Sequence, residues 1–329
     1  MTSIDRTTRA GSPDVPGLVR RARDGDPRSV ARLITLVETG APQLPQVAAA
    51  LAPFTGNAVV VGLTGAPGVG KSTTTSELVR RLRSSGQRVG VLAVDPSSPF
   101  SGGAILGDRV RMQEHATDPG VYIRSMSSRG HLGGLASATP AAVRVLDGVG
   151  CDVVLIETVG VGQAEVEVAG LADTTVVLLA PGMGDAVQAV KAGILEIADV
   201  FVVNKADRDG ADATVRDLKG MLALTATGPG GWRPPVVRAA AARGEGVDEL
   251  AEAIRRHRDW LTGRGELTAR RARRAAAEVE AIALGRLRER IGALRDGTLL
   301  TGIAADVLAG RLDPYAAADR LLDDLTRGS

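Results

Sequence analysis

The stretch from Gly65 to Ser72, with the sequence GAPGVGKS, constrains the fold of this chain more than any other feature. It matches the pattern G-x-x-x-x-G-K-[ST] between an apolar run and a segment of helical character, which is the context the pattern requires. Its glycines let backbone N–H groups turn inward around phosphates, and the following helix N-terminus adds a positive dipole. Lys71 is expected to bridge β- and γ-phosphate oxygens, and the Ser72 hydroxyl to reach Mg²⁺. The predicted phosphate-side contacts are Gly65, Ala66, Pro67, Gly68, Val69, Gly70, Lys71, Ser72 and Thr73.

Short apolar runs that do not alternate with polar residues recur through the middle of the chain, separated by stretches of helical character. Such runs are typical of strands buried on both faces of a parallel sheet. They predict an α/β fold, a P-loop NTPase core with a mostly parallel, doubly wound sheet. The runs lie at 58–63, 89–94, 153–156, 175–179, 200–203 and 235–237, with 121–123 as a candidate for a further short strand.

Helical segments are expected on both sides of this core. Between residues 18 and 51 the pattern predicts an N-terminal helical lead-in of two amphipathic pieces, separated at Gly25-Asp26-Pro27. The expected domains are an N-terminal helical extension at 1–55, a P-loop domain at 56–262 and a C-terminal helical arm at 263–329.

The C-terminal arm is expected to contain a long helix and a second helical stretch beyond residue 299. The long helix has an apolar stripe, which needs cover either from the core or from a second copy of the chain. The stripe consists of Val279, Ile282, Leu287, Ile291 and Leu294.

A second motif directly follows the apolar run at 200–203. Asn204-Lys205-Ala206-Asp207 is the Asn-Lys-x-Asp arrangement that reads guanine. The Asp207 carboxylate would accept hydrogen bonds from guanine N1–H and the exocyclic amine, whereas adenine would leave it unpaired and desolvated. The chain is therefore expected to bind GTP and GDP and to cleave GTP to GDP and phosphate.

The segment at 239–242 occupies the position of the Ser-Ala loop of GTPases, with alanine in place of serine. Its backbone N–H groups can still contact guanine O6. The predicted base-side contacts are Asn204, Lys205, Asp207, Ala240, Ala241 and Ala242.

Glu157 directly follows the run at 153–156, and Gly160 lies three residues later. The arrangement is that of the Asp-x-x-Gly element of GTPases, with glutamate in place of aspartate. Glu157 would hold Mg²⁺ through its water shell, and Gly160 would donate its N–H to the γ-phosphate. Asp95 ends an apolar run and is a further candidate for the metal shell. Asp108 is either another candidate or a plain surface carboxylate, beyond a Ser-, Gly- and Pro-rich stretch expected to be a switch loop.

Composition argues against several classes of partner. The net charge of the 329 residues is +2, so no nucleic-acid partner is expected, and the arginines at 270–274 are read as a solvated helix face. Cys151 is the single cysteine and cannot form an internal disulfide, which fits a reducing, cytoplasmic location. No apolar run approaches the length of a membrane span, so no membrane association is expected.

Several stretches together carry a closer resemblance. They are GLTGAPGVGKST, VLAVDPSSPFSGGAILGDRVRM, SRGHLGGLA, LIETVGVGQAEVEV, APGMGDAVQAVKAGILEIADVFVVNKAD and GEGVDEL, and they span nearly all of residues 15–255. The chain resembles the methylmalonyl-CoA mutase accessory GTPases of the MeaB/ArgK type, once labelled arginine/ornithine-transport kinases. Glu157 in place of aspartate and the segment after Ala180 give this resemblance its specificity, because general GTPases lack both.

The resemblance implies a chaperone that gates cofactor delivery to a coenzyme-B12-dependent acyl-CoA mutase, with methylmalonyl-CoA mutase as the expected partner, and protects the loaded enzyme. It implies a homodimer built on the C-terminal helices. It also implies an additional switch at 182–191, in which Asp185, Gln188 and Lys191 are candidates for carrying the partner's signal to the γ-phosphate. The expected catalytic set is Lys71, Glu157, Gly160, Asp185 and Lys191.

Val161 occupies the position where Ras-type GTPases have a water-orienting glutamine, and Gln163 lies two residues further on. This departure predicts slow intrinsic hydrolysis that the mutase accelerates. Arginines could neutralise charge in the transition state. The candidates are Arg109, Arg111 and Arg129.

Two other functions remain open from the sequence. A nickel- or cobalt-insertion GTPase would need clustered metal ligands, but the candidates are well separated along the chain. A nucleotide-gated scaffold that hardly hydrolyses GTP would need the same motifs, so sequence separates it poorly. The candidate metal ligands are Cys151, His115, His131 and His257.

Overall fold

The structure is a computed structural model, and it describes residues 14–95, 112–127, 138–158, 164–182, 195–224, 230–295 and 298–327. The chain divides into two compact units, Met1–Thr268 and Ala269–Ser329.

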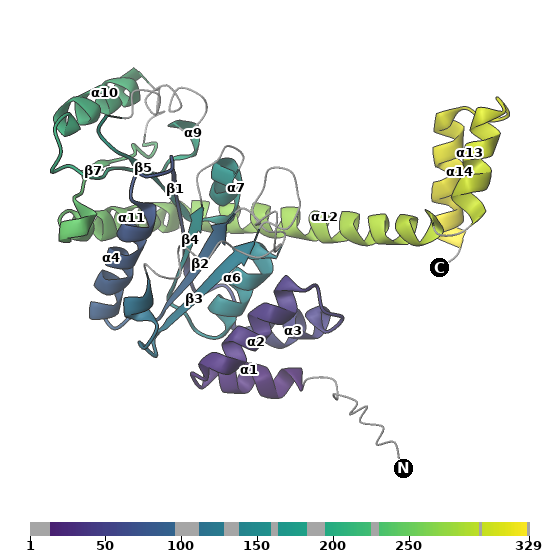
Figure 1. Cartoon of the computed structure of the whole chain (residues 1–329), viewed down its shortest axis with the longest axis horizontal. Helices are drawn as coiled ribbons and strands as arrows, with labels where there is room; N and C mark the ends of the chain where they lie inside the picture. The colour runs from purple at the N-terminus through teal and green to yellow at the C-terminus, as the bar shows by residue number, and fades with distance from the viewer. Residues whose placement is uncertain are drawn as a thin grey trace, which may run out of the picture. The chain divides into compact units, whose positions relative to one another are not determined.

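The first unit is built on a seven-stranded sheet in the order β3-β2-β4-β1-β5-β6-β7, and every neighbouring pair of strands is parallel (Figure 1). The predicted α/β fold is confirmed, and the candidate strand at 121–123 exists and is longer than expected. The strands are β1 (Val59–Gly65), β2 (Val89–Asp95), β3 (Val121–Ser127), β4 (Val153–Thr158), β5 (Thr174–Leu179), β6 (Val200–Val203) and β7 (Val236–Arg238).

Helices cover both faces of this sheet, which explains why its central strands are apolar throughout. On one face, Val61 and Leu63 of β1 share a core with α4 (Lys71–Ser84) and α11 (Val247–Gly263). On the other face, Val60 packs against α7 (Ala164–Leu171). Two further helices cover other strands on these faces: α6 (Thr139–Gly148) and α10 (Ala211–Leu224).

The N-terminal lead-in contains three helices instead of the two expected: α1 (Val15–Arg23), α2 (Pro27–Glu38) and α3 (Leu44–Leu51). The break at residues 25–27 is confirmed, and Asp26 caps α2 by accepting from the N–H groups of Arg28 and Ser29. The missed break follows Glu38, where Gly40 has a φ of 60°. All three helices share an apolar core with α6, so they belong to the sheet-containing unit.

The C-terminal helices are α12 (Glu266–Arg295), α13 (Thr298–Leu308) and α14 (Pro314–Arg327). The stretch expected beyond residue 299 is therefore two helices. Gly310, with a φ of 72°, follows α13, and the Asp313 carboxylate caps α14 through the N–H groups of Tyr315 and Ala316. Ile303 and Ala317 are buried in this pair. No helix in the described part of the chain is both long and apolar enough to cross a membrane.

Candidate nucleotide-binding site

The phosphate loop joins the end of β1 to the start of α4, at the carboxyl edge of the sheet. Its glycines are required by geometry. Gly65 and Gly70 have φ values of 141° and 94°, where L side chains are strained. A Cβ at Gly65 would lie 2.3 Å from Leu178 O, and one at Gly70 would lie 2.4 Å from Asn204 Nδ2. The loop therefore leaves no room for any other residue at either end.

Lys71, the first residue of α4, is only 7% exposed, and its side chain folds back over the loop. Its Nζ donates to Gly65 O at 2.7 Å and to Ala66 O at 3.1 Å. Among the described residues, no side chain caps the N-terminus of α4, as expected where backbone N–H groups bind an anion. The ammonium group is therefore already positioned beside the loop that is predicted to cradle phosphate.

The two residues predicted nearest to Mg²⁺ lie in direct contact. Ser72 Oγ donates to Glu157 Oε1 at 2.6 Å, and both side chains are buried. The contact arises because β4 lies beside β1 in the sheet, with Leu63 opposite Glu157. One residue further along each strand, Thr158 Oγ1 donates to Thr64 Oγ1 at 3.0 Å. A hydroxyl and a carboxylate fit Mg²⁺, which prefers oxygen ligands and keeps several of its waters.

The remaining metal and switch residues are less fully described. Asp95 ends β2, and the neighbouring pair Val94–Thr158 places it at the same sheet edge as Glu157, although only its backbone is described. The other candidates lie outside the described residues: Asp108, Arg109, Arg111, Arg129, His131, Gly160, Val161, Gln163, Asp185, Gln188 and Lys191.

The Asn-Lys-x-Asp motif is bound directly to the phosphate loop. Asn204 Nδ2 donates to Val69 O at 2.8 Å, and Lys205 Nζ donates to Gly68 O at 2.6 Å. Lys205 has a φ of 55°, a left-handed conformation that is uncommon for a residue other than glycine. The sequence predicted base reading by this motif but not its attachment to the phosphate loop.

The third predicted segment joins the same assembly. Asn204 Oδ1 accepts from Ala241 N–H at 3.1 Å, and Ala240 N–H donates to Glu245 O at 3.0 Å. Two of the three alanine N–H groups expected to face guanine O6 are thus bonded within the protein. Ala242 is exposed, and among the hydrogen bonds of the described residues its N–H has no protein acceptor, so it is the best-placed donor of the three.

Asp207 also has an ionic partner that sequence reasoning missed. Arg243 Nη2 lies 3.2 Å from Asp207 Oδ2, and the Asp207 side chain is 28% exposed. Arg243 ends a short 3-10 helix, η4 (Ala241–Arg243), immediately after the alanines. Because the chain contains 36 arginines, the sequence alone could not indicate which of them pairs with Asp207.

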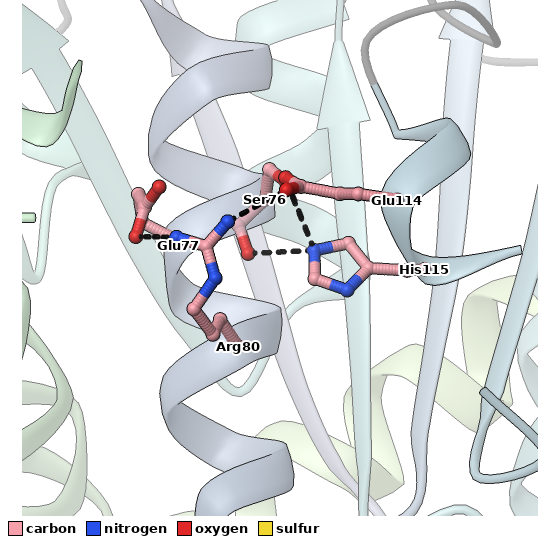
Figure 2. A network of polar contacts seen from close by, with 5 residues as sticks. All are labelled: Ser76, Glu77, Arg80, Glu114 and His115. Carbon is pink, nitrogen blue, oxygen red and sulfur yellow. Dashed lines mark hydrogen bonds and ion pairs between the residues drawn. The ribbon is translucent and has the colours of Figure 1, made fainter. Parts of the chain in front are cut away.

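A polar network connects α4 to the 3-10 helix η2 (Gln113–His115), the first element described after residue 111 (Figure 2). Ser76 Oγ donates to Glu114 Oε1 at 2.5 Å and lies 2.9 Å from His115 Nε2. Arg80 bonds Glu114 Oε2 at 2.7 Å and also pairs with Glu77. The Ser76 hydrogen bond, assisted by Arg80, holds the pKa of the Glu114 carboxyl below its usual range.

The described candidate metal ligands, His115, His257 and Cys151, are not gathered into a site. His115 belongs to this network, whereas His257 is fully buried between Thr174 and Asp199, with Nδ1 2.9 Å from Thr174 Oγ1. Cys151 is buried among apolar residues, and burial raises the pKa of its thiol to about 12. No group of three or more His, Cys, Asp or Glu side chains among the described residues could hold a metal ion.

Known proteins support this interpretation. A Pyrococcus abyssi protein described as a GTPase is 48% identical over 313 residues, covering 94% of this chain and 97% of its own. The mouse methylmalonic aciduria type A homolog is 39% identical over 268 residues, 80% of this chain and 64% of its own. A crystal structure of a LAO/AO transport system kinase aligns with a TM-score of 0.70 at 27% identity, covering 99% of this chain and 100% of the other.

The family described as methylmalonyl-CoA mutase-associated GTPase MeaB matches residues 30–296, a range that includes the phosphate loop, Glu157 and the Asn-Lys-x-Asp motif. The Pyrococcus abyssi relative named a GTPase covers 94% of this chain, and the P-loop fold is the one such enzymes use. This chain belongs to the MeaB family of GTPases.

Proposed function

We propose that this GTPase gates cofactor delivery to a coenzyme-B12-dependent acyl-CoA mutase and protects the loaded enzyme, with methylmalonyl-CoA mutase as the partner. The observation that carries the proposal is the family match, since it spans the phosphate side, the metal side and the base side of the site together. The name of the mouse relative, which refers to methylmalonic aciduria, points to the same acyl group.

In this proposal Lys71 changes its hydrogen-bond acceptors when GTP binds. Its Nζ now donates to two neutral carbonyl oxygens, Gly65 O and Ala66 O. Phosphate oxygens would replace them as acceptors, because an ammonium group is attracted more strongly to an anionic oxygen than to a neutral carbonyl oxygen. The ammonium would thereby offset the negative charge that develops as the γ-phosphate leaves.

Ser72 and Glu157 would hold the magnesium ion, Ser72 directly and Glu157 through water. Mg²⁺ would neutralise charge on the β- and γ-phosphate oxygens. Gly160 would donate its N–H to the γ-phosphate, while Asp185 and Lys191 would carry the signal of the bound mutase. A water-orienting residue is missing at Val161, so the partner is expected to set the rate of hydrolysis.

We propose further that the protein acts as a homodimer through α12. Three members of the predicted apolar stripe are exposed within the single chain: Val279 at 67%, Ile282 at 50% and Leu287 at 44%. Leu284 of the same helix is also 45% exposed. Large apolar side chains grouped on one helix favour burial against another surface.

The proposal is tested by measuring GTP hydrolysis alone and with purified methylmalonyl-CoA mutase, and by capturing each protein with the other. Stimulated hydrolysis and nucleotide-dependent capture are expected. Lys191→Ala should remove the stimulation, while Lys219→Ala, on the exposed side of α10, should retain it. Unchanged stimulation in the Lys191 variant would remove that residue from the signalling role, and no effect of the mutase on either protein would overturn the proposed function.

A further inference from the structure

The ion pair between Arg243 and Asp207 lies on the carboxylate that is expected to recognise guanine. We propose that Arg243 is a positioning residue for base selection, which holds the Asp207 carboxylate in the orientation that accepts from guanine N1–H and the 2-amino group. The inference rests on the assignment of Asp207 as the base-reading residue.

The backbone that carries Arg243 is fixed from several directions. Its N–H donates to Ala240 O at 2.7 Å, and the bridge between Ala240 and Glu245 closes the turn. Gly246, with a φ of 77°, permits a close approach, since a Cβ there would lie 2.0 Å from Arg238 O. The backbone of Arg243 therefore has a defined position, although its side chain is 61% exposed.

The backbone that carries Asp207 is fixed as well. Lys205 bends the chain through its left-handed conformation, and its carbonyl oxygen accepts from Arg208 N–H at 3.0 Å. Ala206 N–H donates to Ala239 O at 2.9 Å, which ties the motif to the segment that leads into η4. Two rigid loops thus present opposite charges to each other, and the freedom that remains is largely that of the two side chains.

A carboxylate offers about four lone-pair sites, so it can accept from an arginine and from guanine at once. The fork of Arg243 can occupy one side of Oδ2 and leave the other edge of the carboxylate for the two guanine donors. Without Arg243, the Asp207 carboxylate would become ordered only when the guanine base binds. Alanine at position 240 supplies no hydroxyl to this region, whereas Arg243, three residues later, supplies a positive charge 3.2 Å from Asp207 Oδ2.

The effect expected is on selectivity rather than on phosphate binding. Inosine retains N1–H but lacks the 2-amino group, so the preference for GDP over IDP measures the contact between Asp207 and that amine. A role of Arg243 in loop folding alone would weaken both nucleotides equally. A role in orienting Asp207 would weaken GDP more, and the preference would fall.

The experiment measures displacement of a fluorescent GDP analogue by GDP and by IDP. Arg243→Ala is expected to lower GDP affinity about fivefold, the upper range for an exposed pair, and IDP affinity by less than about twofold. Arg243→Lys should restore part of the preference. The matched control is Arg238→Ala, because Arg238 lies nearby in the chain and forms an exposed pair with Asp212. This control should leave both affinities within about twofold of the unmodified protein.

Asp207→Asn separates the base-reading role of Asp207 from the positioning role of Arg243. It should abolish the preference for GDP, and adding Arg243→Ala should then change nothing further. If Asp207→Asn leaves the preference intact, the base-reading assignment fails. If that assignment holds but Arg243→Ala lowers both affinities equally or neither, the positioning role of Arg243 is overturned. Thermal unfolding of each variant identifies any loss of affinity that comes from misfolding.

Discussion

The Ser72 hydroxyl donates a 2.6 Å hydrogen bond to Glu157 Oε1, joining the first turn of α4 to the end of β4. Both groups are buried, and both are oxygen donors suited to magnesium. The glutamate that distinguishes this chain from Asp-x-x-Gly GTPases therefore reaches the helix directly after the phosphate loop.

Glu157→Gln should lower GTP hydrolysis about a hundredfold, because the amide retains the shape of the side chain and loses its charge toward Mg²⁺. Initial rates at a series of Mg²⁺ concentrations measure the effect. GDP affinity in EDTA should stay within about threefold of the unmodified protein, which separates a metal effect from a folding effect. Hydrolysis equal to that of the unmodified protein would contradict the metal role of Glu157.

Gly70→Ala should destabilise the protein by about 3 kcal/mol, since the new Cβ would combine a left-handed backbone with a contact 2.4 Å from Asn204 Nδ2. Gly68→Ala is the matched control. Gly68 has a φ of 79°, but a Cβ at this position would meet no atom within 4 Å among the described residues, so the expected cost is about 1 kcal/mol. Urea unfolding without nucleotide measures the stability of both variants. Equal losses of stability would show that the contact with Asn204 is unimportant.

Removing the Ser76 hydroxyl should change the acid sensitivity of the protein. The pKa of Glu114 lies below its ordinary value of 4.5 in the folded state, chiefly because Ser76 donates to it. The ionised carboxylate therefore stabilises the fold above pH 4.5, and this contribution disappears as pH falls through the lowered pKa. Ser76→Ala should raise that pKa and reduce stability at neutral pH by about 1 kcal/mol or less.

The measurement for this network is the free energy of unfolding between about pH 3 and pH 7. The difference between Ser76→Ala and the unmodified protein should shrink at the acid end, where Glu114 is protonated in both. Glu114→Gln, which cannot ionise, should remove the pH-dependent part of the Ser76 effect. A difference that stays constant with pH in both backgrounds would assign Ser76 a packing role only.

Cys151 should be unreactive in the folded protein, because its thiol is buried and its pKa is raised to about 12. A colorimetric thiol assay at about pH 8 should find almost no reaction over an hour in the folded state and one thiol per chain in guanidinium chloride. Rapid labelling of the folded protein would contradict the burial of this side chain.

Charged substitutions on α12 should disrupt the proposed dimer. Val279→Glu with Ile282→Glu would bury two unpaired charges, and sedimentation should show conversion to monomer. Leu224→Glu is the control, since Leu224 is 88% exposed at the end of α10 and should leave the association state unchanged. A double variant that stays dimeric would place the interface elsewhere.

Local patterns predicted most of the core correctly. Apolar runs located all seven strands, because strands buried on both faces need apolar residues throughout. The breaks at Gly40 and Gly310 were missed, since the flanking segments keep helical composition and only the left-handed backbone ends each helix. Local propensity could not distinguish one long helical stretch from two in these places.

Within the site, motifs identified residue types but not their partners. The amide of Asn204 and the guanidinium of Arg243 make contacts across wide sequence separations, to Val69 and to Asp207. Neither contact has a periodic signature, because each depends on which loop ends meet at the sheet edge. His115 is a similar case, since no spacing indicated that it packs against Ser76 of α4.

The two hydrogen bonds of the Asn204 amide, one to Val69 O and one from Ala241 N–H, have a consequence for nucleotide exchange. They hold the base side and the phosphate side in one preorganised frame, so GDP departure does not require the frame to come apart. The entropy cost of ordering these loops is already met in the folded chain. A factor that accelerates exchange would therefore act most readily at the other end of the nucleotide, on Ser72 and Glu157, the residues that would hold magnesium.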